Sequence, residues 1–154
     1  MEIQDRERRI RDSTGRSVDG RARVVLAVDP GRDKCGLAVC TTEQVLHREV
    51  LPTGELVERV RSLVSHHGVD AILVGDQTGS EPVVAALSGL GKPVRVVAER
   101  GSTLAARRRY FQDHPPRGIA RLLPPGMRVP PVPYDDYVAV WLAERYLEHQ
   151  GKWG

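Results

Sequence analysis

Long apolar segments are missing from this sequence of 154 residues. No run approaches the roughly 18 apolar residues that a membrane-spanning helix needs. The amino terminus also lacks the apolar core of a signal peptide, because charged residues interrupt it from the second position onward. We therefore expect a cytoplasmic protein without a membrane partner.

Cysteine and aromatic residues are also scarce. Cys35 and Cys40 are the only cysteines, and their spacing on a predicted strand directs their side chains to opposite faces. This excludes a mutual disulfide and a disulfide-stabilised scaffold of the secreted type. Aromatic residues make up 5% of the chain, so the core must be built mainly from Val, Leu and Ala.

A large excess of one charge is absent as well, since the formal net charge is only +3. The total is weak support for a polyanionic partner, so the distribution of charge carries more information. Residues 1–21 hold six arginines and five acids with almost no periodic apolar residues. We expect a flexible charged tail there, or an arm that touches nucleic acid, followed by one folded domain over residues 22–151.

Regular patterning begins at Ala22. Short apolar or alternating runs predict five strands, at residues 23–29, 35–40, 43–51, 70–76 and 93–99. Helical stripes predict four helices, at residues 53–68, 80–91, 102–112 and 135–151. Ser80 is a candidate N-cap, and Gly68 a helix stop. Residues 112–133 contain seven of the eleven prolines and predict an irregular loop.

This order of elements predicts an α/β fold with one mixed five-stranded sheet flanked by helices. Three strands with short links form an antiparallel meander, and the α and β units that follow add parallel strands. Because crossovers are right-handed, the fourth and fifth strands should lie parallel to the first, beyond its free edge.

Acidic residues recur at the carboxyl ends of the strands that should be parallel. Asp29 ends the first strand, Asp76 the fourth and Glu99 the fifth. Asp135 and Asp136 open the last helix. Ligands of open α/β sheets bind at that edge. Carboxylates gathered there repel one another unless cations lie between them, and all-oxygen ligand sets favour Mg²⁺ or Mn²⁺.

Most of these acids also have a structural interpretation. A strand-end Asp commonly belongs to a turn, and an Asp at a helix start commonly caps the helix. Glu99 has neither explanation, because it follows the buried run VRVVA and its only local partner is Arg100. The combination favours a metal site, in which two ions stabilise the attacking and leaving oxygens of a phosphodiester displacement.

Four stretches together resemble a known family. They are VLAVDPGRDKCGLAV, AILVG, VVAERGSTLAARRRYF and YDDYVAVWLAERYL, and they cover about residues 23–149. Taken together and in this order, the four stretches resemble the YqgF branch of the RuvC-like, RNase H-fold nucleases. The resemblance implies an RNase H-like nuclease with Asp29, Glu99 and Asp135 as metal ligands and Asp136 as an additional catalytic residue. It also implies either junction resolution or processing of ribosomal RNA precursors.

Three departures from the family pattern bear on the substrate. The loop after the fourth strand is the short DQTGS, and Ala98 stands where an Asp is common. The loop before the last helix is longer and richer in proline. All three ligand positions nevertheless keep acidic side chains.

Basic residues are concentrated between two of these ligand positions. From Arg100 to Arg128 there are seven arginines and one acid, Asp113. Arginine suits phosphate groups, and the candidate nucleic-acid contacts are Lys34, Arg100, Arg107, Arg108, Arg109, Arg117 and Arg121. The alternative is a solvated helix face with a charged loop. Tyr110 and Phe111 either stack on unpaired bases or pack in the core.

The leading hypothesis is a nuclease for branched DNA or structured RNA that depends on two Mg²⁺ or Mn²⁺ ions. The alternative is a catalytically inactive module of the same fold that binds nucleic acid or the ribosome. The oligomeric state is open between a monomer and a homodimer, whose two-fold symmetry would match that of a four-way junction.

Overall fold

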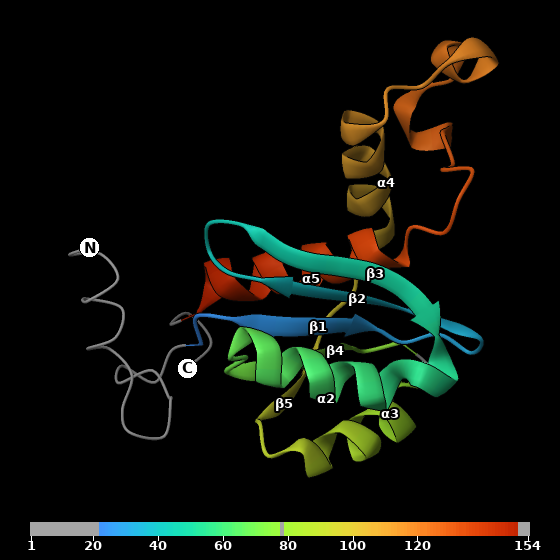
Figure 1. Cartoon of the computed structure of the whole chain (residues 1–154). Helices are drawn as coiled ribbons and strands as arrows, with labels where there is room; N and C mark the ends of the chain where they lie inside the picture. Colours follow the sequence, from blue (N-terminus) through green and yellow to red (C-terminus); the bar gives the residue numbers. More distant parts are fainter. Residues whose placement is uncertain (1–21, 78, 151–154) are drawn as a thin grey trace.

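The computed structural model describes residues 22–77 and 79–150 (Figure 1). The expected tail at residues 1–21 and the last expected domain residue, Gly151, lie outside the described residues. The strands of the described chain are β1 Val25–Asp29, β2 Lys34–Cys40, β3 Val45–Pro52, β4 Ala71–Gly75 and β5 Val94–Val97. Its α-helices are α2 Leu56–His67, α3 Ser80–Leu87, α4 Ser102–Asp113 and α5 Asp135–His149.

The strands form one mixed sheet in the order β3-β2-β1-β4-β5. β1 and β2 pair antiparallel, as do β2 and β3, whereas β4 is parallel to β1 and β5 is parallel to β4. The predicted meander with two added parallel strands is therefore confirmed. β1 lies at the centre of the sheet, and all five of its residues are buried.

The residues of β1 alternate between two hydrophobic cores, one on each face of the sheet. Leu26 and Val28 belong to the core that α2 and α3 cover. Val25 and Ala27 belong to the core that α5 covers. Figure 1 shows α2 and α3 on one side of the strands and α5 on the other. The sheet is thus the middle layer, which explains why its central strand is apolar throughout.

α2 packs through one stripe and ends where the sequence predicts. Its buried residues are Leu56, Val60, Leu63 and Val64. Gly68 follows with φ of 62°, a left-handed conformation that glycine adopts without steric cost. The predicted N-cap of α3 is wrong: Gly79, with φ of 92°, occupies that position, and Ser80 is the first helical residue.

α5 is buried over more than one stripe because it contacts four strands, β1, β2, β3 and β4. Eight of its 15 residues are buried. Cys40 lies in the core under this helix, whereas Cys35 lies in the core under α2. Both thiols are buried and free, as the spacing of the two cysteines predicts.

The segment between α4 and α5 extends away from the sheet (Figure 1). The loop expected at residues 112–133 is in part regular, because α4 continues to Asp113 and two short 3₁₀ turns follow. These turns are η3 Gly118–Leu122 and η4 Pro125–Met127. None of the helices in the described ranges is long and apolar enough to cross a membrane.

Candidate active site

Three carboxylates from three different elements meet at the carboxyl end of β1. Asp29 is the last residue of β1, and the alternation of that strand directs its side chain to the face that α5 covers. Glu99 follows β5, and Asp135 is the first residue of α5. Asp29 and Glu99 are only 5% and 6% exposed. The fold therefore brings together three of the acids that the sequence pattern singles out.

Gly75, the last residue of β4, makes room for Glu99. A Cβ atom at this position would overlap the Cγ, Cδ and Oε1 atoms of the Glu99 side chain. Because Val74 pairs with Val28 in the parallel ladder, the next residue of β4 lies beside Asp29. The missing side chain therefore lets Glu99 lie over the end of β4 and reach Asp29.

Gly36 has the corresponding role on the other side of β1. It pairs directly with Asp29 in the antiparallel ladder. A Cβ atom on Gly36 would overlap backbone atoms of Asp135 and Asp136. The first turn of α5 therefore lies against the backbone of β2, as a glycine within a strand permits. This close approach places Asp135 beside Asp29.

The Asp29 carboxyl group is difficult to ionise in this setting. Its pKa is raised to about 8, first by burial and then by the negative charges of Glu99 and Asp135. Hydrogen bonds with the same two acids raise it further, which places a proton between carboxyl groups. Without a cation, burial and the neighbouring acids therefore favour the protonated form of Asp29.

Glu99 also has a raised pKa, and the segment after β4 supplies its surroundings. Burial is the largest cause; hydrogen bonds with Gln77 and Asp29 act in the opposite direction, and the charge of Asp76 adds to the rise. Asp76 Oδ1 accepts a hydrogen bond from the backbone N–H of Glu99 at 3.0 Å, which fixes this part of the chain. Arg100, the expected local partner, is exposed and forms no ion pair with Glu99 in the described structure.

Three carboxylate oxygens of the site lack a well-aligned donor. Asp29 Oδ1, Glu99 Oε1 and Glu99 Oε2 are buried without a hydrogen bond of ordinary geometry, and among the described residues only Gln77 and the neighbouring acids approach them. Buried polar atoms are nearly always paired. These oxygens are therefore positioned to be satisfied by a cation.

Asp135 is the most accessible acid of the three. Its side chain is 33% exposed, and its Oδ2 lies 3.9 Å from the Lys34 ammonium. It does not cap α5, because Tyr134 occupies the N-cap position. As the side chains stand, no group of three or more His, Cys, Asp or Glu residues within 22–77 and 79–150 is arranged to hold a metal ion. Asp135 nevertheless already lies beside Asp29, with which it shares a hydrogen bond.

Asp136 is paired with a residue of β3. Its Oδ2 accepts a hydrogen bond from Arg48 Nη1 at 2.9 Å. The Arg48 guanidinium also lies 4.3 Å from the centre of the Tyr137 ring. Of the two adjacent aspartates, Asp135 is the one beside Asp29, and Asp136 is neutralised by Arg48.

Replacing Arg48 with methionine should therefore destabilise the fold and leave the site intact. We expect the free energy of unfolding to fall by about 2 kcal/mol, because the partner carboxylate stays largely buried without its charged donor. Adding Asp136→Asn should restore most of this loss in urea denaturation. Arg61→Met is the control, since Arg61 pairs with Glu58 at the surface. A stable Arg48→Met protein that had lost metal binding would instead place Asp136 among the ligands.

The basic residues predicted to contact nucleic acid fall into two groups. Two are held by the protein itself: Arg107 Nε donates a hydrogen bond to Tyr134 Oη at 2.9 Å, and Arg109 forms an ion pair with Glu144. The others are exposed, namely Lys34, Arg100, Arg108, Arg117 and Arg121. The three consecutive arginines of α4 therefore have different surroundings, and of these three only Arg108 is exposed.

Sequence patterns did not identify Gly36, Gly75, Gln77 or Arg48 as parts of this region. A glycine in an apolar strand signals a close approach of other chain segments, so the two glycines carried a usable signal. Arg48 carried none, because a charged residue in an alternating strand is typical of a solvated face.

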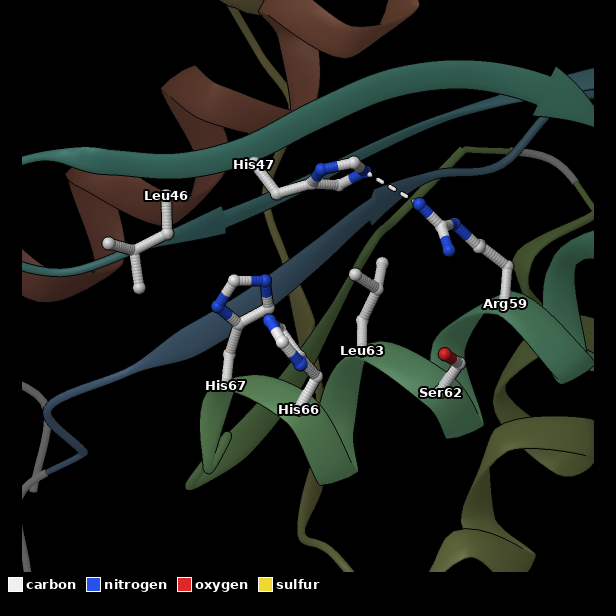
Figure 2. Close-up of a pocket in the computed structure, with 7 residues that line it drawn as sticks. All are labelled: Leu46, His47, Arg59, Ser62, Leu63, His66 and His67. Atoms are coloured by element: carbon white, nitrogen blue, oxygen red, sulfur yellow. Dashed lines mark hydrogen bonds between the residues drawn. The ribbon is translucent and has the colours of Figure 1, made fainter.

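A separate pocket of about 400 Å³ lies between β3 and α2 (Figure 2). It is lined by Leu46, His47, Arg59, Ser62, Leu63, His66 and His67. Figure 2 shows His47 and Arg59 directed toward each other across it. Arg59 also donates from Nε to Glu49 Oε1 at 2.9 Å. The pocket includes none of the site acids and is distinct from the carboxylate cluster.

Comparison with solved structures identifies the fold. The chain is similar to RuvC of Thermus thermophilus in complex with a Holliday junction substrate, with a TM-score of 0.55 and 21% identity. It is similar to another structure of Thermus thermophilus RuvC with a TM-score of 0.53 and 19% identity. Each match covers 82% of this chain and 94% of the other. A scan against protein-family models and a search of curated proteins gave no match. The predicted RNase H-like, RuvC-like fold is thus confirmed, whereas the YqgF branch stays a prediction.

Proposed function

We propose that this protein is a divalent-metal-dependent nuclease that hydrolyses phosphodiester bonds of structured nucleic acid. The observation that carries the proposal is the meeting of Asp29, Glu99 and Asp135, with buried oxygens that lack well-aligned donors. Acids with raised pKa values in a shared site are typical of functional centres. The likeness of the fold to a RuvC that is bound to a Holliday junction agrees with this activity.

The donor set fits a hard divalent cation. Asp29, Glu99 and Asp135 offer only oxygen atoms, which Mg²⁺ and Mn²⁺ prefer over the ligands of zinc or copper sites. When bound, two such ions supply electrostatic stabilisation of the attacking and leaving oxygens. A cation would also remove the repulsion that raises the pKa of Asp29.

Two of the three acids are held in place by the chain, whereas the third can change its contact. Asp29 is fixed by β1, and Glu99 is fixed through its backbone hydrogen bond to Asp76. Asp135 is free to exchange its 3.9 Å contact with Lys34 for a cation. The Lys34 ammonium, which is half exposed, would then be released to contact a phosphate of the substrate.

We infer that the substrate is branched DNA or a structured RNA. These are the substrates that the resemblance to the YqgF branch implies. A homodimer would suit a four-way junction because both have two-fold symmetry. A catalytically inactive binding module of the same fold is the second candidate. The buried acids disfavour it, because negative charge next to a phosphate-binding surface weakens binding unless a cation is present.

Calorimetric titration with Mn²⁺ and a cleavage screen test this proposal together. The screen uses Mg²⁺ or Mn²⁺ with four-way DNA junctions, single strands, linear duplexes and ribosomal RNA precursors. We expect metal uptake and cleavage in the wild type, and loss of both in Glu99→Gln.

Glu81→Gln is the matched control, because Glu81 is exposed in the first turn of α3. It should retain both properties. Wild-type protein that binds a junction but takes up no Mn²⁺ and cuts no substrate would identify the inactive binding module instead.

A further inference from the structure

Residues 114–133, which we call the arm, expose an unusual amount of apolar surface. The described chain has eight exposed large hydrophobic residues, and six of them lie in the arm: Ile119, Leu122, Leu123, Met127, Val129 and Val132. Ile119 and Leu122 are 80% and 85% exposed. Clustered exposed apolar side chains mark an interaction site more often than scattered ones do.

The tip of the arm is held in one conformation by a single side chain. Arg128 Nε donates hydrogen bonds to the carbonyl oxygens of Ala120 and Leu123, both at 3.1 Å. Its Nη2 donates to the carbonyl oxygen of Arg121 at 3.4 Å. These contacts tie Arg128 to the backbone of η3 and of the residue that follows it.

The base of the arm is attached to the helix that carries a site acid. Tyr134, directly before Asp135, accepts a hydrogen bond from Arg107 of α4. Tyr137 Oη donates to Asp113 Oδ2 at 2.9 Å, which ties α5 to the end of α4. The position of the arm is therefore coupled to the position of the carboxylate cluster.

The charge of the arm indicates what covers its apolar surface. No acid occurs from residue 114 to residue 134, whereas Arg117 and Arg121 are exposed there. The same arm of a second copy would present the same positive charge and be repelled. A polyanion is complementary to it. The two helices that support the arm also start at the proposed nuclease site, because α4 begins three residues after Glu99 and α5 begins at Asp135.

The exposed large apolar side chains of the arm itself are Ile, Leu, Met and Val, and none of them is aromatic. Tyr110 is buried against Tyr137, and Phe111 packs against the core under α5. The expectation that these two aromatic residues could stack on bases is therefore not supported by their placement. Leu, Ile and Met can instead enter between base steps and partly unstack them.

We propose that the arm inserts Ile119 and Leu122 between bases of the nucleic acid, while Arg117 and Arg121 contact the flanking phosphates. This inference rests on the proposed function for the identity of the partner, but it requires no cleavage. It gives the protein a preference for branch points, where bases are already easy to unstack.

The length of α4 sets the distance between the inserted residues and the scissile bond. α4 has 12 residues, which span about 18 Å at the rise of an α-helix. A strand that follows the helix would cover this length with about five nucleotides at 3.4 Å each. Unstacking should therefore occur roughly four to six nucleotides from the cut.

Fluorescence of 2-aminopurine tests the insertion without any metal. Forked DNA duplexes, and RNA forks of the same sequence, carry the probe at successive positions from the branch and are mixed with wild-type protein in EDTA. Unstacking raises the fluorescence of this base, so we expect a several-fold rise confined to one or two positions. Ile119→Ser/Leu122→Ser should lose the rise, whereas Val96→Thr, at an exposed apolar position of β5, should keep it.

The arginines are tested by the salt dependence of binding. Arg117→Gln/Arg121→Gln should weaken fork binding about tenfold and reduce the slope of log affinity against log salt by about 2. Wild-type protein that bound neither fork, or bound without a fluorescence rise, would overturn the inference. The inference would also be overturned if Ile119→Ser/Leu122→Ser kept the fluorescence rise. The same holds if the only effect of this variant were to convert a dimer into a monomer, as measured by light scattering.

The two proposals fail separately. Cleavage in Mn²⁺ without a fluorescence rise in EDTA contradicts the insertion of the arm but supports the nuclease activity. A rise without cleavage of any substrate supports the insertion and contradicts the nuclease.

Discussion

Asp29→Asn should abolish cleavage and at the same time stabilise the metal-free protein. The carboxylate lies between Glu99 and Asp135, so it is the one ligand that contacts both others. An amide keeps its size but cannot neutralise a cation. We expect a loss of cleavage of roughly 10³-fold or more, the scale observed when an electrostatic stabiliser of a transition state is removed. Binding of the four-way junction in EDTA should persist.

The stabilisation follows from the sign of the pKa shift. The pKa of Asp29 is about 8 in the folded protein and near 3.8 in an exposed chain. Between these values the folded state holds a proton that the unfolded state releases, so the free energy of unfolding falls as the pH rises. Asparagine removes this dependence. The variant should match the wild type near pH 4 and exceed it at pH 8.5 by more than about 1.4 kcal/mol, the equivalent of one pKa unit.

Urea denaturation in EDTA at pH 4.5, 6.5 and 8.5 measures this difference. Asp33→Asn is the matched control, because Asp33 is exposed in the turn that follows Asp29. It should change neither cleavage nor the pH dependence. Wild-type cleavage by Asp29→Asn would contradict the nuclease proposal, and an unchanged pH dependence would contradict the carboxylate cluster as described.

The position of Asp29 and Glu99 could be predicted from the sequence, because topology alone determines it. Short links force β1, β2 and β3 into a meander, and right-handed crossovers place β4 and β5 beyond β1. Acids at the ends of parallel strands then lie at one edge. Side chains alternate along β1, so Asp29 lies on the same face as Val25 and Ala27. Because the strand is apolar throughout, only the structure shows that α5 covers this face.

The family resemblance favours Asp135 over Asp136, but the residues alone do not decide between them, because the choice depends on contacts that no local pattern encodes. Arg48 comes from β3, 88 positions before its partner Asp136. The approach of α5 to Gly36 likewise depends on the tertiary packing of a helix on a strand far away in sequence. Ser80 shows the same limit locally, since Gly79 takes the N-cap position although serine is the better capping residue.

Gly75→Ala should weaken metal binding while the fold stays intact. The new methyl group would occupy the space of the Glu99 side chain, which is flexible and must take another rotamer, away from Asp29. We expect metal affinity to fall about 10- to 100-fold, as when the support of a ligand is lost, with a matching loss of cleavage. The free energy of unfolding should change by less than about 1 kcal/mol, because alanine is easily accommodated in a strand.

Gly36→Ala separates this effect from general damage, because there the added methyl group would meet the backbone of α5 and not a flexible side chain. A backbone cannot rotate away, so the helix must shift, at a cost of about 1–3 kcal/mol in the free energy of unfolding. Gly89→Ala is the neutral control, since no atom lies within 4 Å of the added methyl group. Two outcomes would contradict these separate roles, in which Gly75 makes room for the Glu99 side chain and Gly36 for the α5 backbone. One is equal destabilisation by Gly75→Ala and Gly36→Ala, and the other is normal Mn²⁺ titration of Gly75→Ala. Loss of Mn²⁺ binding in Gly75→Ala at wild-type stability would establish that the missing side chain serves the carboxylates and not the core.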